Sequence, residues 1–368
     1  MIYPIPFPLS SGRYEVGPAM RRFGTAAGQG LPAEEAHFLP DDDLAATLSA
    51  KLAVLRQAPD QAHLFAPEAE EAGLRAAIHE SFRLLAAEHP EMAAVTADGV
   101  MLHHLGIRVT DWATPAPGLD AVGEPWPELA TVAREIRAWL GGRQGIWRLG
   151  DALGLAVQED LAIVRGPGEG GGAHTGEAPS GAQAGEAPTG AQAGEAPTGA
   201  PPSRDTLEWL HVCLPSNWAP AEKIGRSFIA VHEPVVHSER LLASQAQIIR
   251  AMIHAGPFAR YVWALHRDAE LCHNPRLHQA PPWLAAGSPA DLAAQACFRV
   301  ERQTTHGFPA LNRALFTIRY WVEPLADTVA DPWRRERLAS ALAGMDEAAL
   351  AYKGLGSARD RLVIWLRA

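Results

Sequence analysis

Cysteine is scarce in this sequence: Cys213, Cys272 and Cys297 are the three in 368 residues. An odd and widely spaced set supplies neither a disulfide framework nor a CxxC metal site. The expected compartment is therefore a reducing cytoplasm. No apolar run is long enough to span a bilayer, and the N-terminal MIYPIPFPLSSGRYE lacks the basic and apolar regions of a signal peptide.

Positive charge is also in short supply, with 32 Lys and Arg against 42 Asp and Glu and a net charge of −10. This balance argues against non-specific binding to nucleic acid or to an anionic membrane. A GxGxxG turn after a strand and a group of four cysteines are both missing, so no nicotinamide, flavin or iron–sulfur motif is present. Hydrophobic residues make up 47% of the chain, which is typical of a globular core.

A repeat divides the chain at residues 166–204. GEAPSGAQA, GEAPTGAQA and GEAPTGAPP follow one another from Gly176. These repeats offer almost no large apolar side chain, so they cannot offset the entropy cost of ordering, and we expect a disordered insertion. It separates a mostly helical part, 1–165, from a strand-rich part with terminal helices, 205–368.

Hydrophobic periodicity predicts the elements on either side of the insertion. The expected helices are 41–57, 68–90, 126–142, 219–232, 238–254, 331–345 and 359–368. The expected strands are 207–214, 260–267, 297–305 and 313–322. Consecutive strands with short connections favour antiparallel pairing, and helices grouped before and after them favour the α+β class.

One histidine stands at a notable position in the segment 219–232. Ile224, Phe228 and His232 recur at a spacing of four and would share one apolar face of a helix. A histidine there either reaches into an apolar cavity or is a core residue bonded to a backbone carbonyl. For a lone histidine, the second alternative is the more common.

The strand CFRVERQTT places Arg302 on the same face as Phe298 and Val300. A buried guanidinium needs a carboxylate or phosphate partner. The partner is either Glu159 or Asp160 within the protein, or an acid group of a ligand. These two acids interrupt the apolar run AVQEDLAIV, where they either lie at a helix edge or form a partly buried proton donor with a raised pKa.

Six stretches together resemble the family of haem-dependent oxidative N-demethylase α-subunits. They are GRYEVGPAMR, LSAKLAVLR, AVQEDLAIV, HVCLPSNWAPAEKIGRSFIAVHEPV, FRVERQT and ALFTIRYWVEPL, and they run from residue 12 to about 325. The resemblance implies a PAS-like α+β domain, formed by both parts of the chain, that holds one b-type haem. It also implies oxidation of a small secondary amine such as dimethylamine, with release of formaldehyde. Electrons would come from a separate flavin or iron–sulfur reductase.

The resemblance also implies roles for particular residues. It makes His232 the axial iron ligand, since histidine is a common haem ligand. The other cofactor-binding residues it implies are Arg302, Arg226 and Lys223, for a haem propionate, and Ile224 and Phe228. The acids it implies are Glu159, Asp160 and Glu301, of which one would deliver protons or hold a cationic amine.

The sequence departs from the family after ERQT, where Thr305, His306 and Gly307 follow. His306 is a second candidate ligand, a distal base or a loop residue. We expect His266, His273 and His278 to be surface residues, and the less favoured alternative for His266, in the strand YVWALHR, is that it points inward. Two other function classes stay open: a non-catalytic haem sensor, and a protein that binds a metal or small ligand through its histidines, although His103-His104 is the only close pair.

Overall fold

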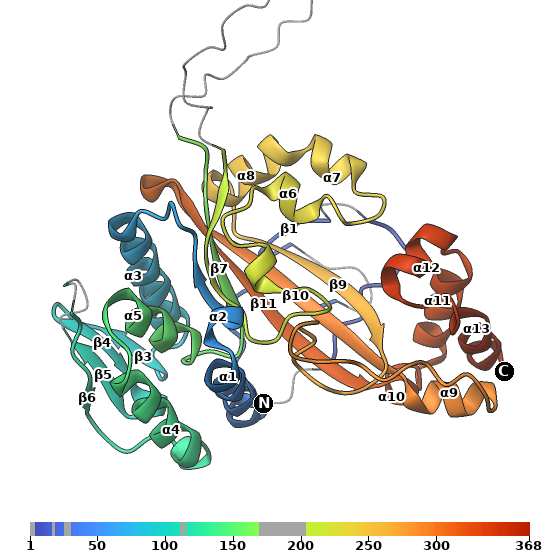
Figure 1. Cartoon of the computed structure of the whole chain (residues 1–368), viewed down its shortest axis with the longest axis horizontal. Helices are drawn as coiled ribbons and strands as arrows, with labels where there is room; N and C mark the ends of the chain where they lie inside the picture. The colour runs from blue at the N-terminus through green and yellow to red at the C-terminus, as the bar shows by residue number, and fades with distance from the viewer. Residues whose placement is uncertain (1–3, 17–18, 26–30, 111–113, 115, 169–203) are drawn as a thin grey trace, which may run out of the picture.

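The computed structural model describes residues 4–16, 19–25, 31–110, 114, 116–168 and 204–368. A seven-stranded antiparallel sheet, ordered β1-β9-β10-β11-β7-β8-β2, forms its centre (Figure 1). Its strands are β1 (Arg21–Arg22), β2 (His63–Phe65), β7 (Asp160–Arg165), β8 (Thr206–His211), β9 (Phe258–His266), β10 (Cys297–Phe308) and β11 (Arg313–Pro324). A smaller antiparallel sheet consists of β3 (Ala93–Val95), β4 (Gly99–Leu102), β5 (Ile107–Thr110) and β6 (Asp120–Ala121).

The helices surround these sheets. The N-terminal part contributes α1 (Leu44–Gln57), α2 (Pro59–Ala62), α3 (Glu71–Glu88), α4 (Ala130–Gly141) and α5 (Gly145–Gly154). The rest contributes α6 (Phe228–His232), α7 (Glu239–Ala243), α8 (Gln245–His254), α9 (Pro289–Gln295), α10 (Leu325–Thr328), α11 (Pro332–Ala343), α12 (Glu347–Lys353) and α13 (Arg359–Arg367). Single 3₁₀ turns lie at His103–Leu105, Pro127–Leu129, Pro220–Glu222 and Pro309–Leu311. Of the helices in these ranges, none combines the length and the apolar character that a membrane span requires.

Strand alternation gives the large sheet two different faces. The face covered by α6, α7 and α8, called here the α6 face, carries Arg260, Val262, Glu301, Gln303 and Phe316. These residues share a face because each lies opposite, or two positions along from, another in the β9–β10–β11 register. Several remain half-buried, so the α6 face is not completely closed.

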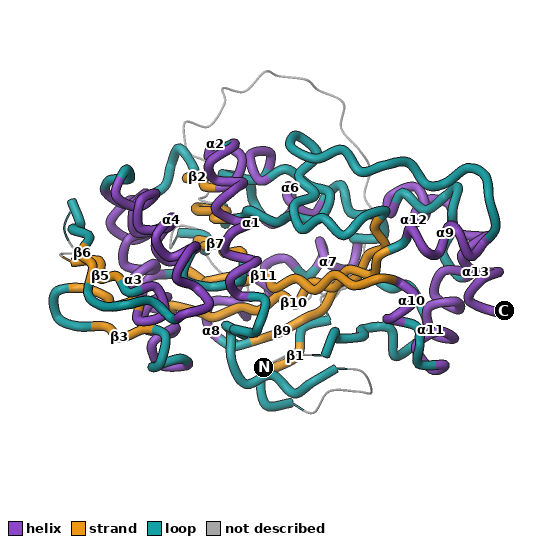
Figure 2. Tube along the Cα trace, turned by 90° about the horizontal axis from the view of Figure 1, so that it is seen from below, coloured by secondary structure: helices purple, strands orange, loops and turns teal. Residues whose placement is uncertain are grey.

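The opposite face is packed by two cores. Phe298 and Val300 contact the C-terminal helices in one core. Leu161, Ile163 and Leu315 belong to the other core, together with residues of α1, α3 and the small sheet, and this core also includes Ile318 and Tyr320 from the α6 face. Figures 1 and 2 accordingly show α3 and α4 with the small sheet at one end of the large sheet, and α9–α13 at the other. Apolar burial on this scale fixes which side of each strand faces inward.

The α+β class and the antiparallel pairing are confirmed, and the alternation expected around Arg302 is also confirmed. The small sheet was not predicted, because its strands are only two to four residues long and give little period-two signal. Residues 169–203, most of the repeat, lie outside the described residues. Their flanks are neighbours in the sheet, since β7 and β8 pair through Val164–Leu207 and Arg165–Thr206.

The helix predicted over 219–232 is wrong. The chain forms a 3₁₀ turn at Pro220–Glu222 and then breaks at Gly225, whose φ of +74° suits glycine far better than other residues. A new helix, α6, begins at Phe228, with the Ser227 side chain accepting a hydrogen bond from the amide of Ala230. Helical spacing therefore relates Phe228 to His232 but does not extend back to Ile224.

Candidate functional site

His232 ends the short helix α6 on the α6 face. Its Nδ1 lies 2.9 Å from the carbonyl oxygen of Phe228. A carbonyl oxygen can only accept, so the ring proton is on Nδ1 and Nε2 keeps its lone pair. The imidazole stacks on the Phe228 ring with centroids 4.1 Å apart. The orientation of the ring is therefore fixed by two contacts within one helical turn.

The electrostatic surroundings keep this histidine neutral. Burial, and then the positive charge of Arg260, lower the pKa of His232 to about 4. A neutral imidazole with one nitrogen bound to a carbonyl and the other free is the form that ligates a metal. His232 thus has the tautomer and the charge state of an axial ligand.

A chain of hydrogen bonds crosses the sheet on the same face. Arg260 Nε donates to Gln303 Oε1 at 2.6 Å, and Gln303 Nε2 donates to Glu301 Oε2 at 2.7 Å. The register that places Gln303 opposite Arg260 makes the first bond possible. Burial lowers the pKa of Lys353, on α12, to about 8, and the charge of Glu301 opposes this shift. Glu301 is therefore a positioned carboxylate between cationic side chains.

Apolar side chains complete this part of the sheet. Val262 and Ala264 on β9 and Phe316 on β11 are half-buried on the α6 face. Phe228 and Phe316 both pack against the same buried cluster, most of which comes from α8. A flat apolar cofactor with acid groups requires such a surface with a few cations at its margin, and Arg260 is one. The residues present therefore fit a haem.

The other cofactor-binding residues predicted around α6 are less closely placed. Ile224 packs against Ala162 and Leu210 of the sheet. Lys223 is half-buried and its Nζ donates to the carbonyl oxygen of Val231 at 2.9 Å. Arg226 is exposed. The structure thus brings His232, Phe228, Lys223 and Ile224 to one side of the sheet, while Arg226 faces solvent.

Glu159 and Asp160 are fully buried and bind backbone amides. Glu159 Oε1 accepts from the amide of Leu39 at 2.9 Å. Asp160 accepts from the amides of Cys213 and Leu214 at 3.0 and 2.7 Å. Burial raises the pKa of Asp160. This agrees with one of the two alternatives expected for these acids, a buried group with a raised pKa. Their proposed role as distal acids stays a prediction, because this geometry shows them holding chain segments together.

Arg302 lies on the opposite face from His232. Its Nε donates to Glu34 Oε2 at 2.6 Å, and its other nitrogens donate to the carbonyl oxygens of Ala36 and His37. The prediction that Glu159 or Asp160 is the protein partner of Arg302 is therefore wrong. The partner is Glu34, from the N-terminal segment, whose long-range contact no local pattern reveals. Binding of a propionate by Arg302 stays a prediction, and this geometry does not support it.

The histidines expected at the surface are mostly inside. His266 and His273 are buried, with 3% and 2% of their surface exposed, and their Nδ1 atoms lie 2.9 Å apart. His278 is half-buried beside Asp268. The surface assignment was wrong, because the segment that carries these residues folds back on the end of the sheet. His306 lies on the opposite face from His232, against the ring of His37.

Two cationic side chains at notable positions, one buried and one half-buried, were not predicted from the sequence. Lys51, within the stretch LSAKLAVLR, is completely buried and donates to three carbonyl oxygens, those of Gly154, Val157 and Glu159. The second is Arg260. Its alternation with Val262 and Ala264 could have revealed a cation on an apolar strand face, the same signal that singled out Arg302.

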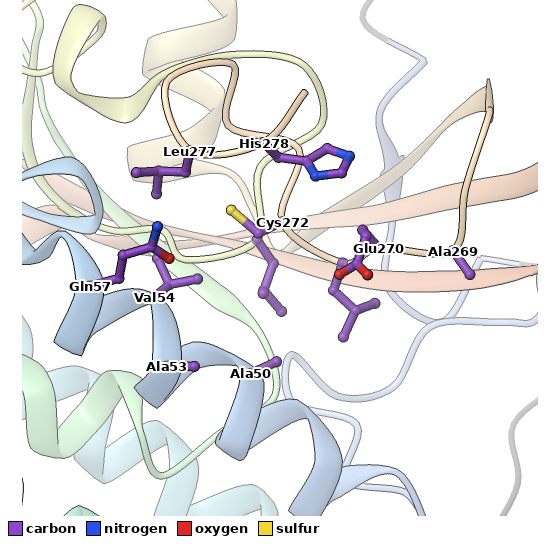
Figure 3. Close-up of a pocket in the computed structure, with 11 residues that line it drawn as sticks. Ala50, Ala53, Val54, Gln57, Ala269, Glu270, Cys272, Leu277 and His278 are labelled. Atoms are coloured by element: carbon purple, nitrogen blue, oxygen red, sulfur yellow. The ribbon is translucent and has the colours of Figure 1, made fainter. Parts of the chain in front are cut away.

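A cavity of about 320 Å³ lies elsewhere, between α1 and residues 269–278. Ala50 and Gln57 line it on one side, and Glu270, Cys272 and His278 on the other (Figure 3). No residue of α6 lines it. It is therefore separate from the surroundings of His232.

Comparison with known families agrees with the resemblance found in the sequence. Residues 196–363 match the family model described as haem-dependent oxidative N-demethylase, alpha subunit-like. The matched range contains α6 and the strands β9, β10 and β11. The family resemblance is thus confirmed over the part of the chain that carries His232, Arg260 and Glu301.

Proposed function

From this match to the haem-dependent oxidative N-demethylase α-subunit-like family, we propose that the chain binds one b-type haem on the α6 face and oxidatively demethylates a small secondary amine. The observation that carries the proposal is His232, whose Nδ1–H is bound to the carbonyl oxygen of Phe228 at 2.9 Å and whose Nε2 is free. We regard the sheet with α6 across it as the PAS-like cofactor domain.

Several residues of the chain have separate roles in the proposed binding of haem. His232 would ligate the iron through Nε2, and Phe228 holds the imidazole ring by stacking on it. Val262, Ala264 and Phe316 would provide the apolar surface for the macrocycle. Arg260 would pair with a propionate, because a guanidinium matches a carboxylate with two parallel hydrogen bonds. The haem, when bound, would supply the activation of oxygen.

Glu301 holds or moves the proton on the substrate side. Its carboxylate, oriented by Gln303 at 2.7 Å, attracts a cationic secondary amine and accepts or returns a proton at its free oxygen. One oxygen atom of O2 would enter a C–H bond of the methyl group to give a carbinolamine, and the other would leave as water after uptake of two electrons and two protons. The C–N bond of the carbinolamine then breaks as its hydroxyl proton passes to nitrogen, which releases the primary amine and formaldehyde. Electrons come from a separate reductase, since the sequence has no nicotinamide, flavin or iron–sulfur motif of its own.

The decisive experiment is an absorption spectrum of the purified protein reconstituted with haem, beside the variants His232→Ala and His254→Ala. His254 is an exposed histidine at the end of α8 and serves as the matched control. We expect a Soret band in the wild type and in the control. His232→Ala loses or shifts the band, and added imidazole restores it.

Two results contradict parts of the proposal. An unchanged spectrum in His232→Ala removes His232 as the ligand. Absence of a Soret band in the wild type after reconstitution removes the haem function altogether. Formaldehyde release from dimethylamine, measured with oxygen and an artificial reductant, then tests the activity. Haem binding without any turnover would favour the non-catalytic sensor.

A further inference from the structure

A second group of potential metal ligands lies in the segment that follows β9. Asp268 Oδ1 is 3.1 Å from His273 Nε2, and Asp268 Oδ2 is 3.1 Å from His278 Nε2. The three ligand atoms all lie within 4.8 Å of one another. Zinc–nitrogen bonds of about 2.0–2.1 Å in a tetrahedron place neighbouring ligand atoms about 3.3 Å apart. The cluster is therefore close to the spacing that a zinc-type ion needs.

His266 supports one of these ligands from behind. Its Nδ1 lies 2.9 Å from Nδ1 of His273, on the ring edge away from Asp268. A metal-bound histidine donates its other N–H to an acceptor, which fixes the ring. His266 supplies that acceptor, and its own Nε2 is buried without a hydrogen-bond partner. This arrangement leaves Nε2 of His273 directed at the shared position beside Asp268.

The charges around the cluster are mixed. Burial, and then the neighbouring His273, lower the pKa of His266, and the cations Arg299, Lys353 and Arg267 add to this shift. Burial, and then Arg299, lower the pKa of His273 to about 4. These cations reduce the affinity of the cluster for a metal ion, and the spacing of the three ligand atoms is what favours one. Arg299 itself is bound by the carbonyl oxygens of Leu271 and Leu214 at 2.8 and 2.6 Å.

The proposed ligands lie in a long loop that has no regular secondary structure of its own. Residues 267–288 connect β9 to α9 without any helix or strand. Loops beyond about 12–15 residues with no regular structure are uncommon in compact domains and are usually functional. Hydrogen bonds attach this loop at several points, among them His273, whose amide donates to the carbonyl oxygen of Pro215 and whose carbonyl oxygen accepts from the amide of Asn217, and Trp283, whose indole donates to the carbonyl oxygen of Gly354. A bound ion would add a cross-link between positions 268, 273 and 278.

A second cluster of similar composition does not need a metal. His63, Asp151 and His211 are also close together. Asp151 Oδ2, however, accepts from Trp139 and Arg143 at 2.8 and 2.7 Å. His63 Nε2 accepts from the indole of Trp209 at 2.9 Å. These lone pairs already serve as hydrogen-bond acceptors, so this cluster is a structural network.

We propose that Asp268, His273 and His278 bind one divalent cation of the zinc type, with His266 as a positioning residue. Two imidazoles and one carboxylate leave a fourth coordination position open. His278 also lines the 320 Å³ cavity together with Cys272 and Glu270 (Figure 3). The site is independent of the haem proposal, because none of these ligands lies on α6.

Zinc titration of the full-length, metal-stripped, haem-free protein tests this site. Calorimetry gives affinity and stoichiometry, and elemental analysis after dialysis gives retained zinc. We expect one zinc per chain in the wild type and in the His254→Gln control. Asp268→Asn and His278→Gln weaken binding at least tenfold, and the His266→Asn change weakens it by roughly 10–100-fold.

The variants Asp268→Asn and His278→Gln change half-buried side chains, and circular dichroism checks that they fold. Limited proteolysis within 267–288 gives a second readout, with slower cleavage on adding zinc in the wild type alone. The proposal is overturned if the wild type retains no zinc. It is also overturned if both folded variants bind zinc as tightly as the wild type.

Discussion

The network around Asp151 makes a sharp prediction for stability. Asp151 is fully buried on α5, and its carboxylate accepts from Trp139 and Arg143 and pairs with His63 at 2.6 Å. Asp151→Asn conserves the shape but removes the charge and turns an NH₂ group toward these donors. Breaking a buried charge pair on one side costs about 3–5 kcal/mol.

The consequence is measurable by heat and urea denaturation. A loss of about 3–5 kcal/mol is a large part of the usual 5–15 kcal/mol of stability. At roughly 2 °C per kcal/mol for a chain of this size, the melting temperature falls by about 6–10 °C. The control is Glu135→Gln, which breaks the exposed pair with Arg56 at 2.7 Å and costs at most about 1 kcal/mol. Equal, small losses in both variants would refute the reasoning.

The same carboxylate predicts a pH dependence. Burial alone would raise the pKa of Asp151, but the pairing with His63 and the hydrogen bonds from His211 and His63 hold it well below its usual value. A depressed carboxyl pKa stabilises the fold above the unfolded-state value of about 3.9 and loses this contribution as the pH falls further. The stability difference between wild type and Asp151→Asn is therefore full at pH 7 and shrinks below about pH 4.

Two further predictions concern the proposed activity and the repeat. Glu301→Gln should leave the haem spectrum unchanged and lower the rate of formaldehyde release by about 10²–10⁴-fold. The half-buried Glu323→Gln is its control, and an undiminished rate would remove Glu301 from the chemistry. Deletion of residues 169–203 shortens the connection between Arg165 and Thr206 from 40 residues to 5. The length of the loop is thereby halved three times, and the lower entropy cost of closing it adds up to about 2 kcal/mol of stability. A large fall in melting temperature would contradict this account.

The long elements could be predicted from the sequence because their periodicity is strong. The strands β9, β10 and β11 alternate over nine to twelve residues, and the structure has all three. The small sheet and the break at Gly225 were missed. Strands of two to four residues give little periodic signal, and one glycine within an apolar run does not by itself identify a turn.

The candidate site was predictable in its local features and not in its long-range contacts. The spacing of Phe228 and His232 is a local feature, and the structure stacks their rings. The partner of Arg302 is Glu34, 268 positions away, and the positive charge that lowers the pKa of His232, after burial, is that of Arg260. Such pairings depend on how the N-terminal segment and the sheet meet, which periodicity does not specify.

Asp160, one of the two buried acids identified in the sequence, has a structural role in the fold. Asp160 binds the amides of Cys213 and Leu214, and Arg299 binds the carbonyl oxygens of Leu214 and Leu271. A carboxylate on β7 and a guanidinium on β10 therefore hold the same backbone, at the point where the chain leaves β8 for α6. By the strand register Asp160 lies on the same sheet face as Glu301, because Asp160 pairs with Ile318 and Ile318 pairs with Gln303. Asp160 is already bound to two backbone amides, whereas Glu301 is bound by the side chain of Gln303. A role in proton delivery stays a prediction for both acids, and the free oxygen of Glu301 makes it the stronger candidate.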